Sequence, residues 1–372
     1  MTILHLTWLP HLSGYEGILH KQQDLARGAA TGGIDLDVRI LSHDAVPGPL
    51  MVPIRCVVMG RIRKLAAMAA SLDLTRYEAI VLRYPGAIDF SLPGFLRQHA
   101  ARLITEHHTD ELAELRDLPA GWLRVGWEQT MGYQFLGRVA GAVAVTRELA
   151  DRLRERGLTA PTAVIANGIA VQEIPWLPPK AWDGVGPLRL LFASGFFWPW
   201  QGLDRLLSGI LQAPPGALQV HLAGQVVRPI DRALCERCQR ERPGQVVVHG
   251  PLTRADLAAV AQEVHGAVST LALHRKGMTE ACPIKSREYL ARGLPLVAAY
   301  RDPDVPAELP GILTVPAAED PVDILALGSA WRRWSVTWGP VTAGLRAHAE
   351  TNLDHRTKAA ALVDFARRCV RP

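Results

Sequence analysis

The sequence lacks several features that would assign it to a specialised class of protein. No apolar run in its 372 residues is long enough to cross a bilayer, so we expect no membrane-spanning helix. The N-terminus has neither a basic segment nor a small-residue cleavage site, which disfavours a secretory signal. Five scattered cysteines, an odd number, indicate a reducing compartment rather than a disulfide framework. We therefore expect a cytoplasmic globular protein.

Signals for metals, nucleic acids and nicotinamide cofactors are also scarce. Cys235 and Cys238 form one CxxC pair with no second pair at zinc-site spacing, so ordinary helix thiols are the simpler interpretation. Asp302 and Asp304 form a D-x-D, but their proline-rich surroundings favour turn chemistry over metal binding. No GxGxxG follows the first apolar run, and the basic residues are dispersed. We expect no metal site and no nucleic-acid partner.

The composition is that of a soluble chain with a large core. Hydrophobic residues make up 48% and charged residues 21% of the sequence, and the length fits two domains of ordinary size. A net charge of +5 suits an acidic ligand such as a nucleotide.

Short aliphatic runs alternate with helical patterns through both halves of the chain. We expect strands over 3–8, 37–42, 54–59, 79–84, 102–107, 142–146 and 162–167, and again over 188–194, 218–224, 245–250, 266–272 and 295–300. Several of these runs are apolar almost throughout, as in strands buried on both faces of a parallel sheet. The alternation predicts an α/β protein with two Rossmann-like, doubly wound parallel-sheet domains.

A proline-rich stretch separates the two halves. Residues 171–187 contain four prolines and are interpreted as a linker. We expect an N-terminal domain over 1–178 and a C-terminal domain over 179–344, with helices of 345–372 able to pack back on the first domain. Ligands of doubly wound folds bind beyond the carboxyl ends of the strands, so function is sought in residues that follow strands.

The segment GMTEACPIKSREYLARGLPLVAAY (277–300) combines carboxylates with a helix start. Pro283 suits the first turn of a helix over 284–292, and Gly293 would end it. Glu280 would lie in the preceding loop and Glu288 in the second turn.

The start of this helix is a candidate anion site. The free amides at Ile284 and Lys285, with the positive end of the helix dipole, favour a phosphate. A diphosphate-linked sugar needs such amides, a cation, and carboxylates for its hydroxyls. A surface helix with two solvated glutamates is an alternative interpretation of the spacing alone.

Several segments resemble one enzyme family. LALHRKGMTEACPIKSREYLARGLPLV (271–297) resembles the E-x7-E signature of retaining GT-B glycosyltransferases of family 4. VIANGI (164–169), LLFASGFFWPWQGLDRLL (190–207) and GYEGILHKQQDLARGAATGGIDLDV (14–38) resemble other parts of that family, so the likeness spans most of the chain. It implies a GT-B fold and the metal-independent transfer of a sugar, with retention, from a nucleotide-diphosphate donor to a hydroxyl acceptor. Glycan, glycolipid or glycoconjugate biosynthesis, including that of polysaccharides, would be the setting.

The resemblance also implies a role for individual residues. Glu280 would contact the donor sugar, Glu288 the ribose hydroxyls, and His108 would match the active-site histidine of the family. The remaining binding positions would be Pro283, Ile284 and Lys285 at the helix start, Gly250 and Pro251 near the base, Gly195 and Gln201 in the loop after the first strand of the second domain, and Gly14 and Tyr15 on the acceptor side.

The sequence departs from the family pattern in the loop GFFWPWQG (195–202). Phe196 and Gln201 stand where an arginine and a lysine usually contact the diphosphate, and glutamine cannot neutralise a phosphate. Either Lys285, Arg275 or Lys276 supplies the missing charge, or donor binding is weak.

Three alternatives therefore stay open: a sugar-nucleotide epimerase of the same fold, a non-catalytic relative that binds a glycan or a partner, and a dinucleotide-dependent oxidoreductase. A helix within 60–78, with Arg61, Arg63 and Lys64 at its start, could contact an anionic membrane, although an ordinary crossover helix is the commoner explanation. The donor base and sugar, the acceptor and the oligomeric state are left open by the sequence.

Overall fold

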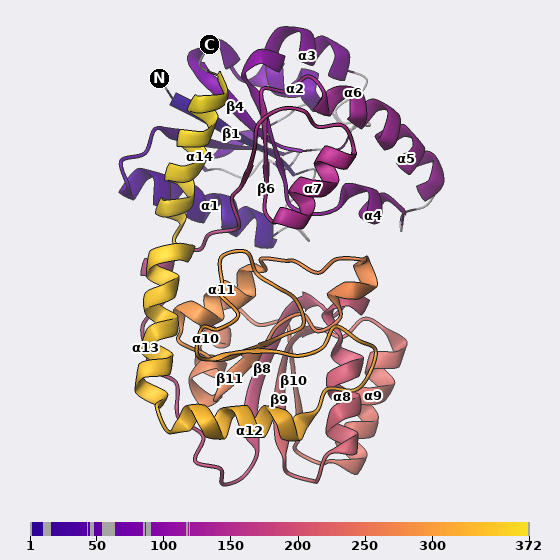
Figure 1. Ribbon diagram of the computed structural model, residues 1–372, viewed down its shortest axis with the longest axis vertical. Helices are drawn as coiled ribbons and strands as arrows, with labels where there is room; N and C mark the ends of the chain where they lie inside the picture. Colours follow the sequence, from indigo (N-terminus) through magenta and orange to yellow (C-terminus); the bar gives the residue numbers. More distant parts are fainter. Residues whose placement is uncertain are drawn as a thin grey trace. The chain divides into compact units, whose positions relative to one another are not determined.

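The computed structural model describes residues 2–9, 16–42, 44, 48–53, 64–84, 86, 91–116, 118 and 120–370. Its contacts divide the chain into two compact units (Figure 1). The first unit contains the residues up to Ala170 together with those from Asp354 onward, and the second contains Val171–Leu353.

The proline-rich stretch that was expected to link two domains packs on the second unit. Trp182 is buried in the core of that unit. Trp338 donates its indole N–H to the carbonyl of Pro179 over 2.6 Å, and Arg346 donates to the carbonyl of Ile174 over 2.8 Å. These contacts place the change from one unit to the other at Ala170, before the prolines, whereas the expected boundary was residue 178.

The first unit is built on a seven-stranded sheet in the order β3-β2-β1-β4-β5-β6-β7, with every neighbouring pair parallel. Its strands are β1 (Thr2–Trp8), β2 (Leu36–Ser42), β3 (Met51–Pro53), β4 (Tyr77–Arg83), β5 (Leu103–His107), β6 (Gly141–Ala144) and β7 (Thr162–Val164). Strands β1, β4, β5 and β6 are almost wholly buried, as their continuous apolar runs predicted.

Helices cover this sheet. They are α1 (Glu16–Thr31), α2 (Lys64–Ser71), α3 (Leu92–His99), α4 (Glu111–Arg116), α5 (Gly121–Trp127), α6 (Tyr133–Leu136), α7 (Arg147–Glu155) and α14 (His355–Val370), with shorter turns η2 (Leu74–Arg76), η3 (Ala100–Arg102) and η4 (Glu128–Gly132). The last helix, α14, packs its apolar face on β1, β4, β5 and β6, and it runs alongside α1 (Figure 1). A Cβ at Gly28 of α1 would lie 2.8 Å from that of His355, so this close approach requires glycine.

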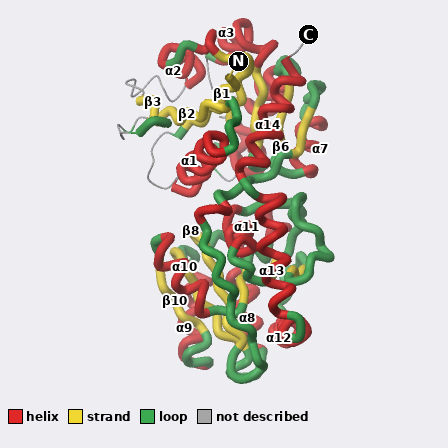
Figure 2. The backbone as a smooth tube through the Cα atoms, turned by 90° about the vertical axis from the view of Figure 1, so that its left-hand side faces the viewer, coloured by secondary structure: helices red, strands yellow, loops and turns green. Residues whose placement is uncertain are grey.

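The second unit contains a six-stranded parallel sheet in the order β10-β9-β8-β11-β12-β13. The strands are β8 (Leu188–Phe196), β9 (Leu218–Gln225), β10 (Val246–Gly250), β11 (Gly266–Val268), β12 (Leu296–Ala298) and β13 (Ile312–Thr314). The helices are α8 (Leu203–Gln212), α9 (Pro229–Glu241), α10 (Arg254–Glu263), α11 (Ile284–Ala291), α12 (Ile324–Ser335) and α13 (Trp338–His348), with turns η5 (Val171–Glu173), η6 (Pro199–Gln201), η7 (Leu273–Lys276) and η8 (Ala349–Leu353). Figure 2 shows the strands of each unit gathered between helices.

The predicted fold class is confirmed: both units are Rossmann-like parallel sheets covered by helices. The expected strand at 54–59 lies outside the described residues. Two strands were missed, β3 and β13, because each has three residues and depends on a neighbouring strand at the sheet edge rather than on its own pattern. Strand β11 is shorter than expected, since the chain leaves the sheet after Val268.

The CxxC pair and the helix expected within 60–78 are both ordinary helical features. Cys235 and Cys238 are buried in α9, and burial raises the pKa of the two thiols to about 12 and about 11, as for inert helix thiols. Helix α2 buries Leu65 and Met68, which fits a crossover helix, while Arg61 and Arg63 lie outside the described residues. In the part of the chain that the structure describes, no helix is both long and apolar enough to cross a membrane.

Candidate active site

Helix α11 begins where the sequence predicted. Pro283 is its N-cap, one position before the first helical residue, and its carbonyl accepts from the amides of Ser286 and Arg287 over 3.1 and 3.4 Å. The amides of Ile284 and Lys285 precede these and have no acceptor within the helix. Gly293 ends the helix with a φ of 68°, a conformation that favours glycine. The helix therefore presents two free amides and its positive dipole end beyond β11.

Buried hydroxyl groups hold α11 against the sheet. Tyr289 accepts from the backbone amide of Ala193 on β8 over 3.0 Å. Ser286 lies 2.6 Å from the hydroxyl of Ser269, and Tyr300 lies 2.7 and 2.8 Å from these two hydroxyls. The start of α11 is thus fixed to the carboxyl ends of β8, β11 and β12.

The D-x-D motif after β12 is part of this support. Fully buried Arg287 donates to Asp302 over 2.7 Å and to Asp304 over 2.8 Å. The Asp302 carboxylate also accepts from the amide of Asp304 over 3.0 Å, a turn interaction of the kind expected from the sequence. No group of three or more His, Cys, Asp or Glu side chains that could hold a metal occurs among the described residues.

The side chain of Lys285 reaches from α11 to Gln201, the residue that stands where the loop after β8 was expected to carry a lysine. Its ammonium donates to the side-chain oxygen of Gln201 over 2.7 Å and lies 4.8 Å from the centre of the Phe192 ring. No carboxylate of the described residues forms an ion pair with Lys285. Burial of the ammonium lowers its pKa to about 7. The site therefore holds a cation whose nearest polar partner is neutral.

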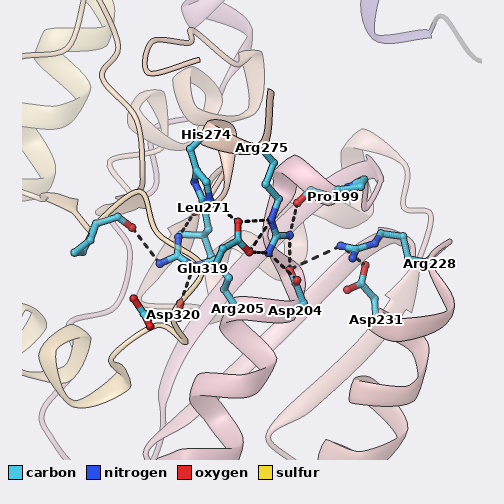
Figure 3. A network of polar contacts seen from close by, with 11 residues as sticks. Pro199, Asp204, Arg205, Arg228, Asp231, Leu271, His274, Arg275, Glu319 and Asp320 are labelled. Atoms are coloured by element: carbon cyan, nitrogen blue, oxygen red, sulfur yellow. Dashed lines mark hydrogen bonds and ion pairs between the residues drawn. The ribbon is translucent and has the colours of Figure 1, made fainter. Parts of the chain in front are cut away.

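The other two candidate cations are engaged differently. Arg275 donates to both carboxylate oxygens of Asp204 over 3.0 and 2.8 Å, to Glu319, and to the carbonyl of Pro199 over 2.8 Å (Figure 3). Hydrogen bonding to Glu319 raises the pKa of this guanidinium despite its partial burial. Lys276 lies 4.0 Å above the ring of Trp200. Lys285 is the cation at the start of α11, and within the described part of the chain it has no carboxylate partner.

Buried Arg205 of α8 joins two loops of the second unit, the one after β11 and the one after β13 (Figure 3). Its guanidinium donates to the carbonyls of Leu271, Pro316 (3.0 Å) and Asp320 (2.8 Å). With Arg275, it fixes the turns η6 and η7 relative to each other, so the loop that carries Gln201 is held rigidly.

The two glutamates of the predicted motif lie at different ends of the α11 segment. Glu280 precedes the helix and is largely buried, and its Oε1 is 3.7 Å from Nη2 of Arg301. Glu288 lies in the second turn of α11, partly exposed, with its Oε1 4.0 Å from Nη2 of Arg254 on α10. Glu288 therefore faces α10, and Glu280 lies before the amides.

The two candidate glycines of the second unit, Gly195 and Gly250, lie at strand ends with open space where a side chain would stand. A Cβ at Gly195 or Gly250 would meet no atom within 4 Å, and Pro251 is exposed. Gly250 ends β10 with a φ of 70°. Gly195 lies at the end of β8, in the same loop as Gln201. The structure thus brings Gln201, Lys285 and the start of α11 together, and places Gly250 and Pro251 after a different strand of the same sheet.

In the first unit, His108 follows β5 and belongs to a buried polar cluster. Its Nε2 lies 2.9 Å from Glu106, which also binds His5 over 2.9 Å. Lys21 of α1 places its ammonium 3.2 Å from Nε2 of His108 and 3.7 Å from Glu106. Burial lowers the pKa of His108 to about 3, assisted by Lys21 and Arg83, so the imidazole is neutral at pH 7.

Glu106 is the anion of this cluster. Burial alone would raise its pKa, but the hydrogen bond to neutral His108 and the charge of Lys21 outweigh that effect and hold the pKa well below its usual value. The only sequence signals for this cluster are a histidine in the apolar run of β1, His5, and a lysine in α1, Lys21.

His107 has a separate, internal role. Its Nδ1 bonds Glu111 over 2.6 Å, and Arg156 joins Glu111 to Glu128 over 2.7 and 2.8 Å. His107 is fully buried, whereas His108 lies at the strand end as expected. Gly14 and Tyr15, the other acceptor-side candidates, lie outside the described residues.

This architecture is that of a GT-B protein. It resembles sucrose-phosphate synthase from Thermosynechococcus elongatus (16% identity, 99% of each chain, TM-score 0.67). It also resembles Anabaena HepE in complex with UDP and glucose (14% identity, 99% of this chain and 100% of that one, TM-score 0.67). The lipopolysaccharide outer core galactosyltransferase WaaB gives the same coverage and identity with a TM-score of 0.63. At these identities the likeness defines the fold.

The family resemblance has a second, independent source. Residues 23–173 match the family described as Glycosyltransferase Family 4, so the resemblance to family 4 is confirmed over this part of the chain, whereas the retaining mechanism and the E-x7-E signature stay predictions. No curated protein sequence matches the chain. The matched residues lie almost wholly in the first unit, and the Glu280–Glu288 segment lies outside them. Family and fold together support a glycosyltransferase.

Proposed function

We propose that this protein is a retaining glycosyltransferase that moves a sugar from a nucleotide-diphosphate donor to a hydroxyl acceptor. The observation that carries the proposal is the Lys285 ammonium, which lies 2.7 Å from Gln201 and forms no ion pair with a carboxylate of the described residues, on a residue whose own amide is at the start of α11. A cation and helix-start amides together suit the two phosphates of a sugar nucleotide. Solved relatives of the same fold include HepE bound to UDP-glucose, which agrees with a donor of this kind.

The second unit supplies the donor-binding residues in this proposal. The amides of Ile284 and Lys285 and the ammonium of Lys285 bind the diphosphate. Glu288 accepts hydrogen bonds from the ribose, and Glu280 contacts the donor sugar. The exposed backbone at Gly250 and Pro251 receives the base.

The proposed reaction breaks the bond between the anomeric carbon and the diphosphate oxygen and forms a bond from that carbon to the acceptor oxygen on the same face. The acceptor proton passes to the departing diphosphate. Lys285 and the amides stabilise the charge that develops on the leaving group, an electrostatic contribution that often dominates enzymatic rate enhancement. Since this charge comes from the protein, we propose that transfer requires no metal.

His108 has the acceptor-side role in the first unit. With a pKa of about 3 it is neutral at physiological pH, so it acts as a hydrogen-bonding group rather than as a cation. Cytoplasmic glycan or glycoconjugate synthesis is the proposed setting.

The non-catalytic alternative rested on the missing basic residues of the loop at Phe196 and Gln201. The position of Lys285 weakens this alternative, because a lysine from α11 reaches the side chain that replaces the loop lysine. An epimerase would bind the same donor, and it differs by converting that donor without an acceptor.

Calorimetric binding of UDP, GDP, ADP, TDP and CDP tests the donor site. One nucleotide should bind selectively, and Glu288→Ala should weaken it by about 1.5–3 kcal/mol, roughly 10–100-fold, because charged hydrogen bonds to ribose are lost. Glu263→Ala, which removes an exposed glutamate of α10, is the matched control and should leave binding unchanged. Unaltered affinity in folded Glu288→Ala would remove the ribose assignment.

Turnover then separates the activities. Wild-type protein given the sugar nucleotides of the selected base, with candidate hydroxyl acceptors, should release the nucleoside diphosphate and give a product of unchanged anomeric configuration by NMR. Conversion of the donor into an isomeric sugar nucleotide would instead identify an epimerase. Binding without release or conversion would identify a non-catalytic protein.

A further inference from the structure

The α4–α5 segment of the first unit exposes large apolar side chains together. Trp122 is 77% exposed, Leu123 54%, Leu118 46% and Trp127 39%. All four fall within ten residues of chain, whereas most large apolar side chains of this unit are buried. Exposed apolar groups that gather in this way mark contact surfaces rather than ordinary solvent-facing positions.

Helix geometry shows that three of these side chains lie on one face of α5. Successive residues of a helix are about 100° apart, so Trp122, Leu123 and Trp127 fall within an arc of about 140°. Gly126 lies inside the same arc and is also exposed. Gly121, on the other side of the helix, is buried. The large apolar side chains of α5 therefore face outward, the reverse of a helix that packs on a core.

The outward face is held in place at both ends of the helix. A Cβ at Gly121 would lie 2.3 Å from the carbonyl oxygen of Arg116, so α4 and α5 approach closely there. After α5, buried Glu128 accepts from the hydroxyl of Tyr84 over 2.6 Å and from Arg156 over 2.8 Å. The exposure of Trp122 and Trp127 therefore follows from a fixed backbone.

The exposed charges of the described residues in this segment are mainly positive. Among the described residues from Glu111 to Arg138, the exposed ionic side chains are three arginines and one glutamate: Arg116, Arg124, Arg138 and Glu114. Glu111 and Glu128 are paired with Arg156 inside the unit. Arg124 falls about 60° beyond Trp127 around the helix, at the border of the apolar arc.

We propose that α5 docks on the surface of an anionic lipid bilayer. Tryptophan prefers the boundary between lipid headgroups and acyl chains, leucine adds apolar burial, and the arginines attract anionic headgroups. No comparable surface exists on α2, whose Leu65 and Met68 are buried. The proposal does not depend on sugar transfer, and its test uses no activity.

Cosedimentation of the full chain with lipid vesicles tests the proposal. Wild-type protein should bind vesicles of phosphatidylcholine containing phosphatidylglycerol more tightly than vesicles of phosphatidylcholine alone. Trp122→Ser/Leu123→Ser should weaken binding by at least about tenfold, because two of the most exposed apolar side chains are lost. Arg116→Gln/Arg124→Gln should weaken binding to the anionic vesicles by about fivefold for each charge, and added salt should mimic it.

A matched control is available in the second unit. Leu325 and Val336 are 59% and 84% exposed, so Leu325→Ser/Val336→Ser also replaces two exposed apolar side chains by serine and should bind vesicles like wild type. Because every substituted side chain is exposed, circular dichroism should show unchanged folding. Equal vesicle binding by wild type and Trp122→Ser/Leu123→Ser would overturn the proposal, as would no binding by wild type. A wild-type dimer that dissociates in that variant, without vesicle binding, would assign the face to a second copy of the chain.

Discussion

The two units differ in how their buried charges are balanced. In the first unit, the carboxylate of Glu106 is contacted by His5, His108 and the ammonium of Lys21 within a buried cluster. In the second unit, Lys285 has a neutral partner, Gln201, and stands beside amides with no acceptor in the helix. An internally balanced cluster contributes to folding, and an unbalanced cation beside free donors is available to an anionic ligand. The same type of sheet thus supports a stable polar core in one unit and a prepared anion site in the other.

The largest expected effect comes from breaking the balance of the first unit. Glu106→Gln keeps the size of the side chain but leaves Lys21 without its anion, so we expect a loss of about 3 kcal/mol in local stability. Hydrogen exchange followed by mass spectrometry reads both units at once. Peptides from β5 should exchange more than about 100-fold faster, and peptides from β12 should be unaffected.

Glu155→Gln is the control for this change, because it neutralises an exposed glutamate of α7. It should leave exchange in both units unchanged. If Glu106→Gln left β5 as protected as in wild type, the cluster would not be a source of stability.

Moving the cation tests the second unit. Lys285→Gln should lower affinity for the selected nucleotide by about 10–100-fold, because a charged hydrogen bond to phosphate is lost. Stability should be unchanged or higher, since a desolvated ammonium is removed. The exchanged pair Gln201→Lys/Lys285→Gln returns an ammonium to nearly the same point, and we expect its affinity to return to within a few-fold of wild type. An exchanged pair as weak as Lys285→Gln alone would show that the position on α11 is not interchangeable with the loop.

The smallest expected effects are pH dependences. A rise in pH should weaken ligand binding by the second unit, and a fall in pH should weaken the stability of the first unit. Lys285 has a pKa of about 7, and a bound diphosphate would raise it, so affinity for a sugar nucleotide should fall by up to about tenfold per pH unit above 7. Lys285→Gln should abolish this fall, which calorimetry from pH 6 to 9 would measure.

His108 gives the opposite trend. Its folded pKa of about 3 lies below the usual value of 6.5, so the unfolded chain binds more protons between these values. The stability of the first unit should therefore fall as the pH drops from 6.5 toward 3. Hydrogen exchange of β5 peptides at pH 7 and pH 5, corrected for intrinsic rates, would detect it; equal protection would contradict the buried, neutral imidazole.

The sequence predicted the fold and the start of α11 because both depend on local signals. Apolar runs marked most of the strands, and Pro283 and Gly293 marked the ends of the helix within a residue or two. The departure at Gln201 was also visible. The sequence did not show which cation contacts Gln201, because Lys285, Arg275 and Lys276 are all basic residues close together in the chain. Their contacts depend on residues distant in sequence, such as Asp204 and Glu319 for Arg275.

The same limit applies to the first unit. His108 could be singled out from its place after a strand, but its neutral state depends on burial and on Lys21, eighty-seven residues earlier in the chain. The sequence does not show that the apolar face of α5 points outward, because the apolar spacing of this helix is that of an ordinary core helix. Only the exposure of each side chain shows which way such a helix faces.

The contacts of Arg205 have a consequence for how chains of this kind can change during evolution. One guanidinium fixes the carbonyl of Leu271 after β11 and the carbonyls of Pro316 and Asp320 after β13, so these two loops share a single anchor. An insertion or deletion in either loop would displace an acceptor and disturb the other loop. The turn at Gly250 and Pro251 has no such tether among the described residues, so length variation is best tolerated there, next to the place proposed for the base. Nucleotide preference could then diversify while the anchored loops keep their lengths.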